Sequence, residues 1–549
     1  MTILQSGIAR PSSGYDIDQS LRFEDGDSAY LSRTPGSAGN LKTWTLSFWR
    51  KQESGSTTEP IMTCGSYSGG ITTVYFTSSG RLAIADYSSG AYNVKINSEA
   101  LYRDPSAWSH YMVVWDTSNA ASTDRVRIFK DGSRVTDINS GGNTFPSLNF
   151  DGEINSAALH MIGRDGSASS DYGRGYIAEV HFLDGTSLTD ASSFGETDAA
   201  TNQWKPTEVT GLTYGTNGFY QKYSATELAN SFTDSRSTGT PHTLTAVGNV
   251  TNTRAQSKFS SSSVYSYDWS DNINCSPHVL LPTEFTWEGW VRFENATPGE
   301  TAFFNLWDGS VIGGHDNRSY RIWYQTNTLG VAVSSDGDNP NSNERFFSWT
   351  PSQNTWYYIS VGRDSSYDCR AFVDGTQVGV TQSLSRDAFT PETSATEQYL
   401  AGQNGVWYQD VQFSTTNRYT TTYSIPTASV IPDSDTVFLV NSDFDGGLGA
   451  DSSGNKNDFA ATNLVATDQM IDTPTLNYCT MNPLDAKGTV SASEGNLKVT
   501  TTSGNPEMRG TIAIPSTGKW YWEFLNQTSV SMMIGVADQR TSGSAYGSS

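Results

Sequence analysis

Basic residues are scarce in this chain of 549 residues. It has 34 Lys and Arg against 57 Asp and Glu, which gives a formal net charge of −23 at pH 7. Such a charge repels phosphate groups, and the few basic residues are scattered rather than clustered. The composition therefore argues against binding of nucleic acid or of an anionic membrane surface.

Cysteine and long apolar runs are also rare. The four cysteines have no repeated spacing, so they form neither a disulfide framework nor a metal knuckle; they are Cys64, Cys275, Cys369 and Cys479. No apolar run approaches the length of about 20 residues that spans a membrane. Residues 1–20 contain neither a basic nor an apolar signal-peptide region. We expect a protein made in a reducing cytosol, without membrane insertion.

Helical periodicity is missing as well. Apolar residues instead form short alternating stretches bounded by Gly, Asn, Asp and Ser, and the chain has 50 Gly and 12% aromatic residues. This pattern is typical of β-strands joined by turns. Because one domain takes roughly 150 residues, we expect an all-β protein of several domains.

One phrase occurs twice. "SAWSHYMVVWDTS" (106–118) and "QNTWYYISVGRDSS" (353–366) each place a Trp eight residues before an Asp. Upstream, "WTLSFWRK" (44–51) matches "FTWEGWVRF" (285–293). Each stretch alternates at the period of two that is typical of a strand.

The matches continue downstream in the same order. "RVRIFKDGSRVT" (125–136) corresponds to "CRAFVDGTQVG" (369–379), and both contain the Asp-Gly pair of a tight hairpin turn. A late strand then carries an acidic residue between aromatics, which is Glu179 in the first copy and Asp410 in the second. The shared order indicates duplication of one β-domain.

The succession "LRFEDGDSAYLS", "WTLSFWRK", "AWSHYMVVWDT" and "RIFKDGSRV" resembles the laminin-G/pentraxin-like branch of the concanavalin A-like lectin/glucanase superfamily. The resemblance implies two antiparallel jelly-roll sandwiches in tandem. Residues 518–523 (GKWYWE) and 534–536 (IGV) resemble the opening strands of a SPRY domain, which implies a partial C-terminal β-sandwich. The expected organisation is an arm (1–18), sandwich 1 (19–200), a turn-rich connector (201–250), sandwich 2 (251–445), a polar linker (446–485) and an incomplete SPRY-like domain (486–549).

The whole arrangement resembles tail-fibre and other virion-surface proteins of marine bacteriophages. This resemblance implies a structural protein of the virion tail, assembled in the host cytoplasm, that attaches to host-surface glycan. It also implies a homo-oligomer whose N-terminal arm docks to other virion proteins. Two alternatives are a decorating or scaffold protein that makes only protein contacts, and a polysaccharide depolymerase.

Catalysis is the less favoured reading. A retaining glycosidase needs two carboxyl groups about 5–5.5 Å apart, and Glu179 and Asp184 point to opposite faces of their strand. His110, His160 and His181 fall within strand motifs and are expected to be structural. We therefore predict that the chain is not an enzyme.

Two kinds of binding site are candidates. Aromatic and polar side chains that could contact a sugar gather in the second copy, at Trp307, Asp308, His315, Asp316, Asn317, Trp323 and Tyr324. The laminin-G-like resemblance implies calcium at the rim, for which the first copy offers Asp25, Asp27, Asp165 and Asp171. The aromatics could instead fill the core, and Asp-Gly-Asp sequences are also ordinary turn formers.

Overall fold

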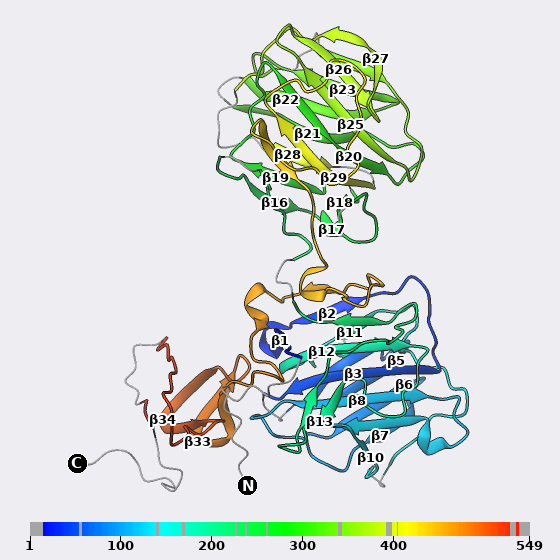
Figure 1. Ribbon diagram of the computed structural model, residues 1–549, viewed down its shortest axis with the longest axis vertical. Helices are drawn as coiled ribbons and strands as arrows, with labels where there is room; N and C mark the ends of the chain where they lie inside the picture. The colour runs from blue at the N-terminus through cyan, green and yellow to red at the C-terminus, as the bar shows by residue number, and fades with distance from the viewer. Residues whose placement is uncertain are drawn as a thin grey trace, which may run out of the picture. The chain divides into compact units, whose positions relative to one another are not determined.

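The structure is a computed structural model that places the chain in two compact units. It describes residues 15–53, 57–138, 142–166, 171–224, 228–236, 239–259, 262–268, 270–312, 315–338, 343–390, 398–402, 405–527 and 534–536. Unit 1 consists of Met1–Thr226 and Leu448–Ser549, and unit 2 of Glu227–Gly447. The strand pairings described are antiparallel throughout, so the predicted all-β class is confirmed (Figure 1).

Unit 1 is a sandwich of two sheets. The first has the order β10 (Ser133–Val135), β9 (Val126–Lys130), β8 (Ser109–Asp116), β3 (Thr43–Lys51), β12 (Gly175–Asp184), β1 (Ser20–Phe23) and β32 (Gln469–Met470), with β15 (Phe219–Gln221) also on β12. The second has the order β31 (Ala460–Thr462), β2 (Tyr30–Arg33), β11 (His160–Ile162), β4 (Glu59–Ser66), β5 (Gly70–Phe76), β6 (Leu82–Ser88) and β7 (Ala91–Asn97). Trp44 and Trp115 stack in the core at 5.6 Å between ring centroids. A short ribbon of β13 (Gly195–Thr197) and β14 (Trp204–Pro206) completes the unit.

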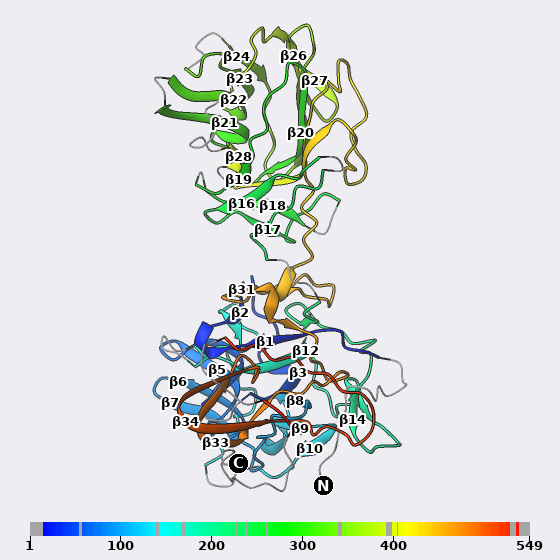
Figure 2. The same ribbon diagram turned by 90° about the vertical axis from the view of Figure 1, so that its left-hand side faces the viewer.

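Unit 2 is a second sandwich, whose two layers are visible in Figure 2. One sheet has the order β27 (Thr376–Ser383), β26 (Asp368–Val373), β25 (Trp356–Arg363), β20 (Phe285–Phe293), β29 (Val406–Ser414), β18 (Ser263–Ser266) and β17 (Thr251–Thr253), with β30 (Thr436–Val440) on β29. The other has the order β16 (Thr243–Val247), β19 (Asn272–Ser276), β28 (Gln398–Gly402), β21 (Thr301–Ile312), β22 (His315–Gln325), β23 (Thr328–Val333) and β24 (Glu344–Ser348).

The two sandwiches have the same strand order in both sheets, which confirms the predicted duplication. Trp49 of β3 lies opposite His110 of β8, and Trp290 of β20 lies opposite Tyr358 of β25. Trp108 directly precedes β8, and Trp356 is the first residue of β25. The repeated Trp therefore occupies the same place in both copies.

The predicted Asp-Gly hairpin is also the same in both. Asp131 has a φ of +46° and Asp374 a φ of +50°, and each is followed by a Gly that also has positive φ. Asp131 Oδ1 accepts the backbone N–H of His110 at 2.8 Å, as Asp374 Oδ1 accepts that of Tyr358 at 2.9 Å. The Asp carboxylate thus fastens the turn to a neighbouring strand of the sheet, β8 in unit 1 and β25 in unit 2.

A bulge recurs at the acidic residue of the late strand. Glu179 in β12 has a φ of +49° and Asp410 in β29 a φ of +51°, and the register shifts at both points. An extra residue in one strand bends it and increases its twist. The acid predicted from the motif is therefore part of a bulge that the two copies share.

The strands at one edge of each sandwich come from different places in the sequence. In unit 2, β16 and β17 precede the rest of the sandwich, whereas their counterparts β31 and β32 in unit 1 follow the whole of unit 2. We call residues 448–479 the closing segment of unit 1. Asp451 accepts the N–H of Tyr220 in β15 at 2.9 Å, and Asp234 accepts that of Leu439 in β30 at 3.0 Å. The correspondence of β31 and β32 with β16 and β17 was not predicted from the sequence.

The division therefore differs from the expected boundaries. Most of the segment expected to be a linker, 446–485, belongs to unit 1, where Lys51 Nζ is 2.6 Å from Asp472 Oδ2 and both side chains are buried. The expected connector, 201–250, is divided between the two units. Of the arm, residues 1–14 lie outside the described residues, whereas Ile17 is buried and its N–H donates to Thr475 Oγ1 at 3.0 Å.

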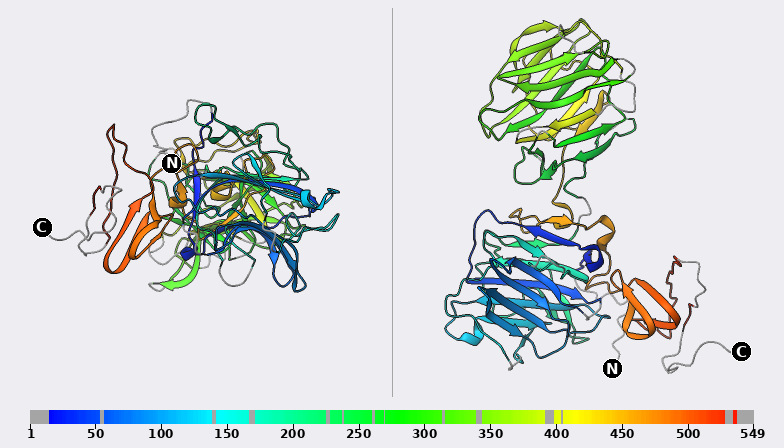
Figure 3. Two further views of the ribbon diagram at one scale, coloured as in Figure 1. Left: turned by 90° about the horizontal axis from the view of Figure 1, so that it is seen from below. Right: turned by 180° about the vertical axis from the view of Figure 1, so that it is seen from behind.

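A long hairpin follows the closing segment, drawn in orange in Figure 3: β33 (Met481–Ser493) and β34 (Lys498–Gly510). Its turn is bound to sandwich 1, because Glu494 N–H donates to Glu24 Oε2 at 2.6 Å and Tyr176 Oη–H to Gly495 O at 2.7 Å. The described residues 511–527 and 534–536 contain no strand, although strands were expected there, and Tyr521 and Trp522 are exposed. The SPRY-like identity stays a prediction.

Candidate functional site

The predicted sugar-binding residues lie at the turn between β21 and β22 of unit 2. The side chains of Asp308, His315, Asp316 and Asn317 lie outside the part of the chain that the structure describes. Trp307 is half-buried, and the Arg321 guanidinium lies 5.2 Å from the centre of its ring. Sugar binding by these residues of the β21–β22 turn stays a prediction.

Trp323 and Tyr324 require a correction. Each is only 1% exposed. Adjacent residues of a strand point to opposite faces: Tyr324 belongs to the core, while Trp323 is covered by Arg321, whose guanidinium is 3.8 Å from the ring centre. Neither side chain offers a surface for a sugar, so these two predictions were wrong.

The equivalent turn of unit 1, between β4 and β5, borders an open hollow of about 370 Å³. That volume is within the range of small-molecule sites, about 300–1,000 Å³. Three parts of the chain contribute: the β4–β5 turn, the segment around Glu153, and the segment that follows β11. The lining residues are Gly65, Ser66, Gly69, Gly70, Glu153, Ala158, Leu159, Met161, Arg164, Asp165 and Gly166.

Glycine is required at the floor of the hollow. A Cβ on Gly166 would lie 2.4 Å from the carbonyl oxygen of Gly65, and one on Gly70 would lie 2.7 Å from Glu153 Oε1. Gly65 and Gly70 also have φ values of +88° and +115°, a region that other residues rarely adopt. The turn can therefore approach the neighbouring segments closely only with these glycines.

Arg164 supplies the positive charge of the hollow. Its guanidinium lies 4.7 Å from the ring centre of Tyr30 and 5.6 Å from that of Tyr172, a cation–π arrangement that orients it. Within the described residues its Nε is buried without a hydrogen-bond partner. The rings of Tyr30 and Tyr172 thus hold the arginine in place.

Two carboxylates, Glu153 and Asp165, line the hollow with this arginine, and Asp171 lies next to Asp165. Asp165 and Asp171 come together because the Asp165 N–H donates to the Asp171 carbonyl at 3.1 Å. Burial raises the pKa of Asp171, and the charge of Asp165 raises it further. Burial also raises the pKa of Glu153, and Asp86 adds to that shift. The lining of the hollow therefore contains two acidic side chains and one basic side chain.

Exposed tyrosines adjoin the hollow. Tyr67, in the β4–β5 turn, is 46% exposed, and Tyr92 in β7 is 48% exposed. Tyr87 lies between them, 5.8 Å from Tyr67 and 5.2 Å from Tyr92 between ring centroids. Burial raises the pKa of Tyr67, and the charges of Asp165 and Asp171 add to this, so Tyr67 and these acids are near neighbours.

Aromatic rings beside hydrogen-bonding groups are what a sugar needs, since its C–H face packs on a ring while its hydroxyls bind polar groups. The sequence pattern did not single out Tyr67, Tyr87 and Tyr92 as candidates. The available signal was a Tyr within a Ser/Gly turn, in "GSYSGG" (65–70) and "DYSSGAYN" (86–93), where a buried core aromatic is not expected.

The predicted calcium ligands divide into two places. Asp165 and Asp171 border or adjoin the hollow, whereas Asp25 forms an ion pair with Arg174 and Asp27 lies in the 3-10 turn Asp25–Asp27. Among the described residues, no three His, Cys, Asp or Glu side chains are grouped to hold a metal ion. Because calcium takes six to eight oxygen ligands, Asp165 and Asp171 supply too few by themselves.

The buried polar groups of the β12 sheet have structural partners. Ser47 Oγ lies 2.8 Å from His110 Nε2, and Tyr214 Oη lies 2.7 Å from His181 Nδ1. Burial lowers the pKa of His110 to about 3 and that of His160 to about 4, so both are neutral at pH 7. All three histidines of the strand motifs, His110, His160 and His181, are buried. The four cysteines are free, as expected.

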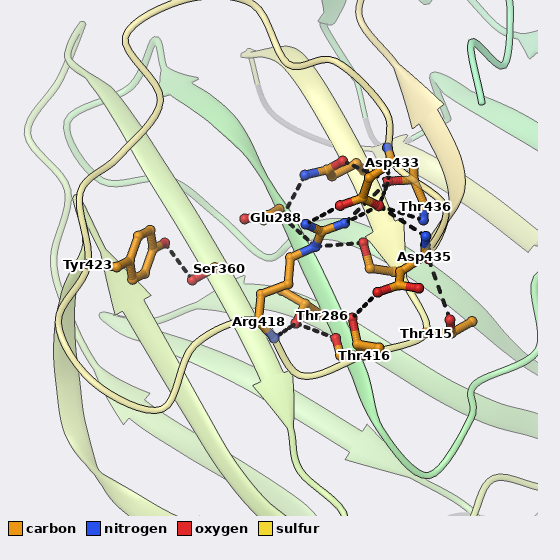
Figure 4. Close-up of polar contacts among 12 residues, drawn as sticks. Thr286, Glu288, Ser360, Thr415, Thr416, Arg418, Tyr423, Asp433, Asp435 and Thr436 are labelled. Carbon is orange, nitrogen blue, oxygen red and sulfur yellow. Dashed lines mark hydrogen bonds and ion pairs between the residues drawn. The ribbon is translucent and has the colours of Figure 1, made fainter. Parts of the chain in front are cut away.

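A carboxylate of unit 2 is buried in the same way (Figure 4). Glu288 of β20 is 0% exposed, accepts a hydrogen bond from Gln412 Nε2 at 2.6 Å and lies 3.4 Å from Arg418 Nε. Arg418 also contacts Asp433 at 2.8 Å. These contacts fasten the segment between β29 and β30 to the sheet, so the cluster stabilises the sandwich rather than facing a ligand.

No helix in the described part of the chain is both long and apolar enough to cross a bilayer. A search of curated protein sequences finds no significant match.

Parts of the chain are similar to several solved structures, of which three are described. A heptameric pentraxin of Limulus polyphemus is 18% identical over 32% of this chain and 80% of its own, with a TM-score of 0.23. Domains LG4-5 of the mouse laminin α1 chain are 11% identical over 75% of this chain and 95% of theirs, with a TM-score of 0.23. The ligand-binding domain of botulinum neurotoxin serotype D, in complex with N-acetylneuraminic acid, is 10% identical over 35% of this chain and 48% of its own, with a TM-score of 0.26.

Sequence identities and TM-scores this low carry no argument about function. The family comparison is more direct, because residues 25–192 match the family model Laminin_G_3, described as the concanavalin A-like lectin/glucanases superfamily. This range contains most of sandwich 1 and all residues that line the hollow. Residues 25–192 are therefore similar to domains of the concanavalin A-like lectin/glucanases superfamily.

Proposed function

We propose that this chain is an adhesin of a bacteriophage virion, a tail fibre or related surface protein, which binds host-surface glycan through the hollow of unit 1. The observation that carries the glycan part is the exposed ring of Tyr67 beside Asp165, which lines the hollow, with the exposed Tyr92 reached through Tyr87. A lectin-like sandwich with an open, polar and aromatic rim is suited to weak binding of a polar ligand.

The virion part of the proposal rests on the resemblance of the whole chain to tail proteins. In this proposal the N-terminal arm docks to another virion protein, and several copies assemble so that many weak sites act together. Linked sites gain through effective concentration, and avidity can exceed single-site affinity by about 10²–10⁴-fold. The virion tail, assembled in the host cytoplasm, is the proposed location.

Two experiments test the two parts separately. A glycan array probed with the full chain tests sugar binding, and binding that Tyr67→Ala and Tyr92→Ala abolish would assign it to the hollow. Antibodies against the chain test the virion part: they should label phage particles and slow adsorption to host cells. Unlabelled particles would refute the virion role while leaving the sugar site standing.

A further inference from the structure

The charges of the hollow indicate which sugars it accepts. We infer that the site, if it binds glycan as proposed above, selects uncharged sugars held through two neighbouring hydroxyl groups and rejects sialylated, uronic or sulfated ones. Arg164 and two carboxylates line the hollow, a third carboxylate and the exposed ring of Tyr67 lie beside it, and all belong to the described residues of unit 1.

The first step is the balance of charge. Glu153 and Asp165 line the hollow, Asp171 is joined to Asp165 through the backbone, and Arg164 is the one cationic residue of the lining. An anionic sugar group would meet one guanidinium and several carboxylates. Like charges placed together at a site disfavour binding. The surrounding chain, with its net charge of −23, adds to this repulsion.

The second step is hydrogen-bonding capacity. A guanidinium only donates and an ionised carboxylate only accepts, whereas a hydroxyl does both. Two adjacent hydroxyls can therefore accept from Arg164 and donate to Asp165 or Glu153 at once. A sugar carboxylate or sulfate has only acceptors to offer, so it would leave the acids of the hollow facing a like charge.

The third step is that the donor, and the backbone that carries Asp165, are fixed in advance. The rings of Tyr30 and Tyr172 orient the guanidinium of Arg164. An isolated bridge joins the backbones of Arg164 and Tyr172, and the Asp165–Asp171 hydrogen bond lies beside it. Preorganised groups lose little conformational freedom on binding, which sharpens the discrimination between ligands.

The test is a glycan array of the full chain that pairs each neutral oligosaccharide with its sialylated or sulfated form, followed by titration calorimetry of the best pair. We expect neutral members to bind at least about tenfold more tightly, with little dependence on salt because a neutral ligand carries no charge to screen. Equal or tighter binding of anionic members would overturn the inference and leave the glycan function standing. Binding of no sugar would refute the proposed function itself.

Variants separate charge selection from simple loss of the site. Asp165→Asn with Asp171→Asn removes two negative charges and keeps the shape, so anionic sugars should gain at least about fivefold relative to neutral ones. Arg164→Gln should weaken neutral sugars about tenfold or more. Asp18→Asn with Asp137→Asn, at two exposed positions outside the hollow, removes the same charge and serves as the control. An equal gain in the control would assign the selection to net charge alone and overturn the role of the hollow.

Discussion

Removing the carboxylate of Asp472 should unfold the edge of sandwich 1 without affecting unit 2. Lys51 is 0% exposed, and its ammonium group has three acceptors from the closing segment: Asp472 Oδ2 at 2.6 Å, Asn477 Oδ1 at 2.8 Å and Tyr478 O at 2.7 Å. Asp472 Oδ1 also accepts Trp108 Nε1–H at 2.8 Å. One carboxylate thus holds together the closing segment, β3 and the repeated Trp.

The expected magnitude follows from these contacts. Asp472→Ala leaves the Lys51 ammonium buried with two neutral acceptors and leaves the Trp108 N–H without its partner. Loss of one member of a buried ion pair costs about 3–5 kcal/mol, because the remaining charge stays desolvated. We expect the free energy of unfolding of unit 1 to fall by about that amount. Lys51→Met with Asp472→Leu should cost less than Asp472→Ala alone, since no buried charge remains.

Hydrogen exchange measured by mass spectrometry is the suitable assay, because it reports the stability of each segment separately. Peptides from β1, β2 and residues 448–479 should exchange faster in Asp472→Ala, while peptides from unit 2 should not change. Asp151→Asn is a matched control: Asp151 lies 3.8 Å from Lys42 on the surface, where such a pair contributes about 0–1 kcal/mol. A loss below about 1 kcal/mol in Asp472→Ala would refute the reasoning.

Three other predictions concern pH, ring contacts and calcium. Burial raises the pKa of Glu53 to about 8. The folded chain therefore keeps a proton that the unfolded chain releases near pH 4.5, and stability should fall as the pH rises from about 4.5 to 8. Glu53→Gln should remove that fall and stabilise the protein at pH 8.5 by up to about 5 kcal/mol in chemical denaturation. An unchanged pH profile would contradict this expectation. Tyr67→Ala and Tyr92→Ala should each weaken glycan binding about fivefold or more in calorimetry, without a change in melting temperature, because both rings are exposed; a lowered melting temperature would instead assign them a structural role. If Asp165 and Asp171 bind calcium, the melting temperature should be higher in millimolar calcium than in chelator. Asp165→Asn should abolish this rise. Identical melting temperatures in the two conditions would speak against calcium at this pair.

The duplication was predictable because its strongest signals are local. An Asp-Gly pair between alternating apolar residues specifies a tight hairpin whatever surrounds it, and Asp131 and Asp374 occupy such turns. The alternating Trp residues likewise define which face of each strand is covered. These features depend on neighbours in sequence, so two diverged copies still showed them.

The closing segment could not be found by the same reasoning. Its counterpart in unit 2 precedes the sandwich, so a search for motifs in a shared order does not pair 460–470 with 243–253. The segment is rich in Asn, Asp and Ser, which resembles a linker. Its stability comes from long-range contacts such as Asp472 with Lys51, and local composition does not reveal them.

The candidate site was only partly predictable for a related reason. The sequence pointed to the β21–β22 turn because aromatic residues are dense there, and the structure shows the hollow at the equivalent β4–β5 turn of unit 1. Density does not distinguish an exposed ring from a covered one. Trp323 is buried through contact with Arg321 in the same strand, a packing arrangement that the residue pattern does not determine.

The split of unit 1 has a consequence during synthesis. Its first part ends at Thr226 and its second begins at Leu448, so 221 residues of unit 2 (227–447) emerge from the ribosome in between. At about 5–20 residues per second, that interval lasts roughly 10–45 s. During this time the nascent first sandwich has two unpaired edges, at β1 and β2, while unit 2 has all its strands and can fold. Unit 2 is thus expected to reach its native form before unit 1, although its synthesis begins later.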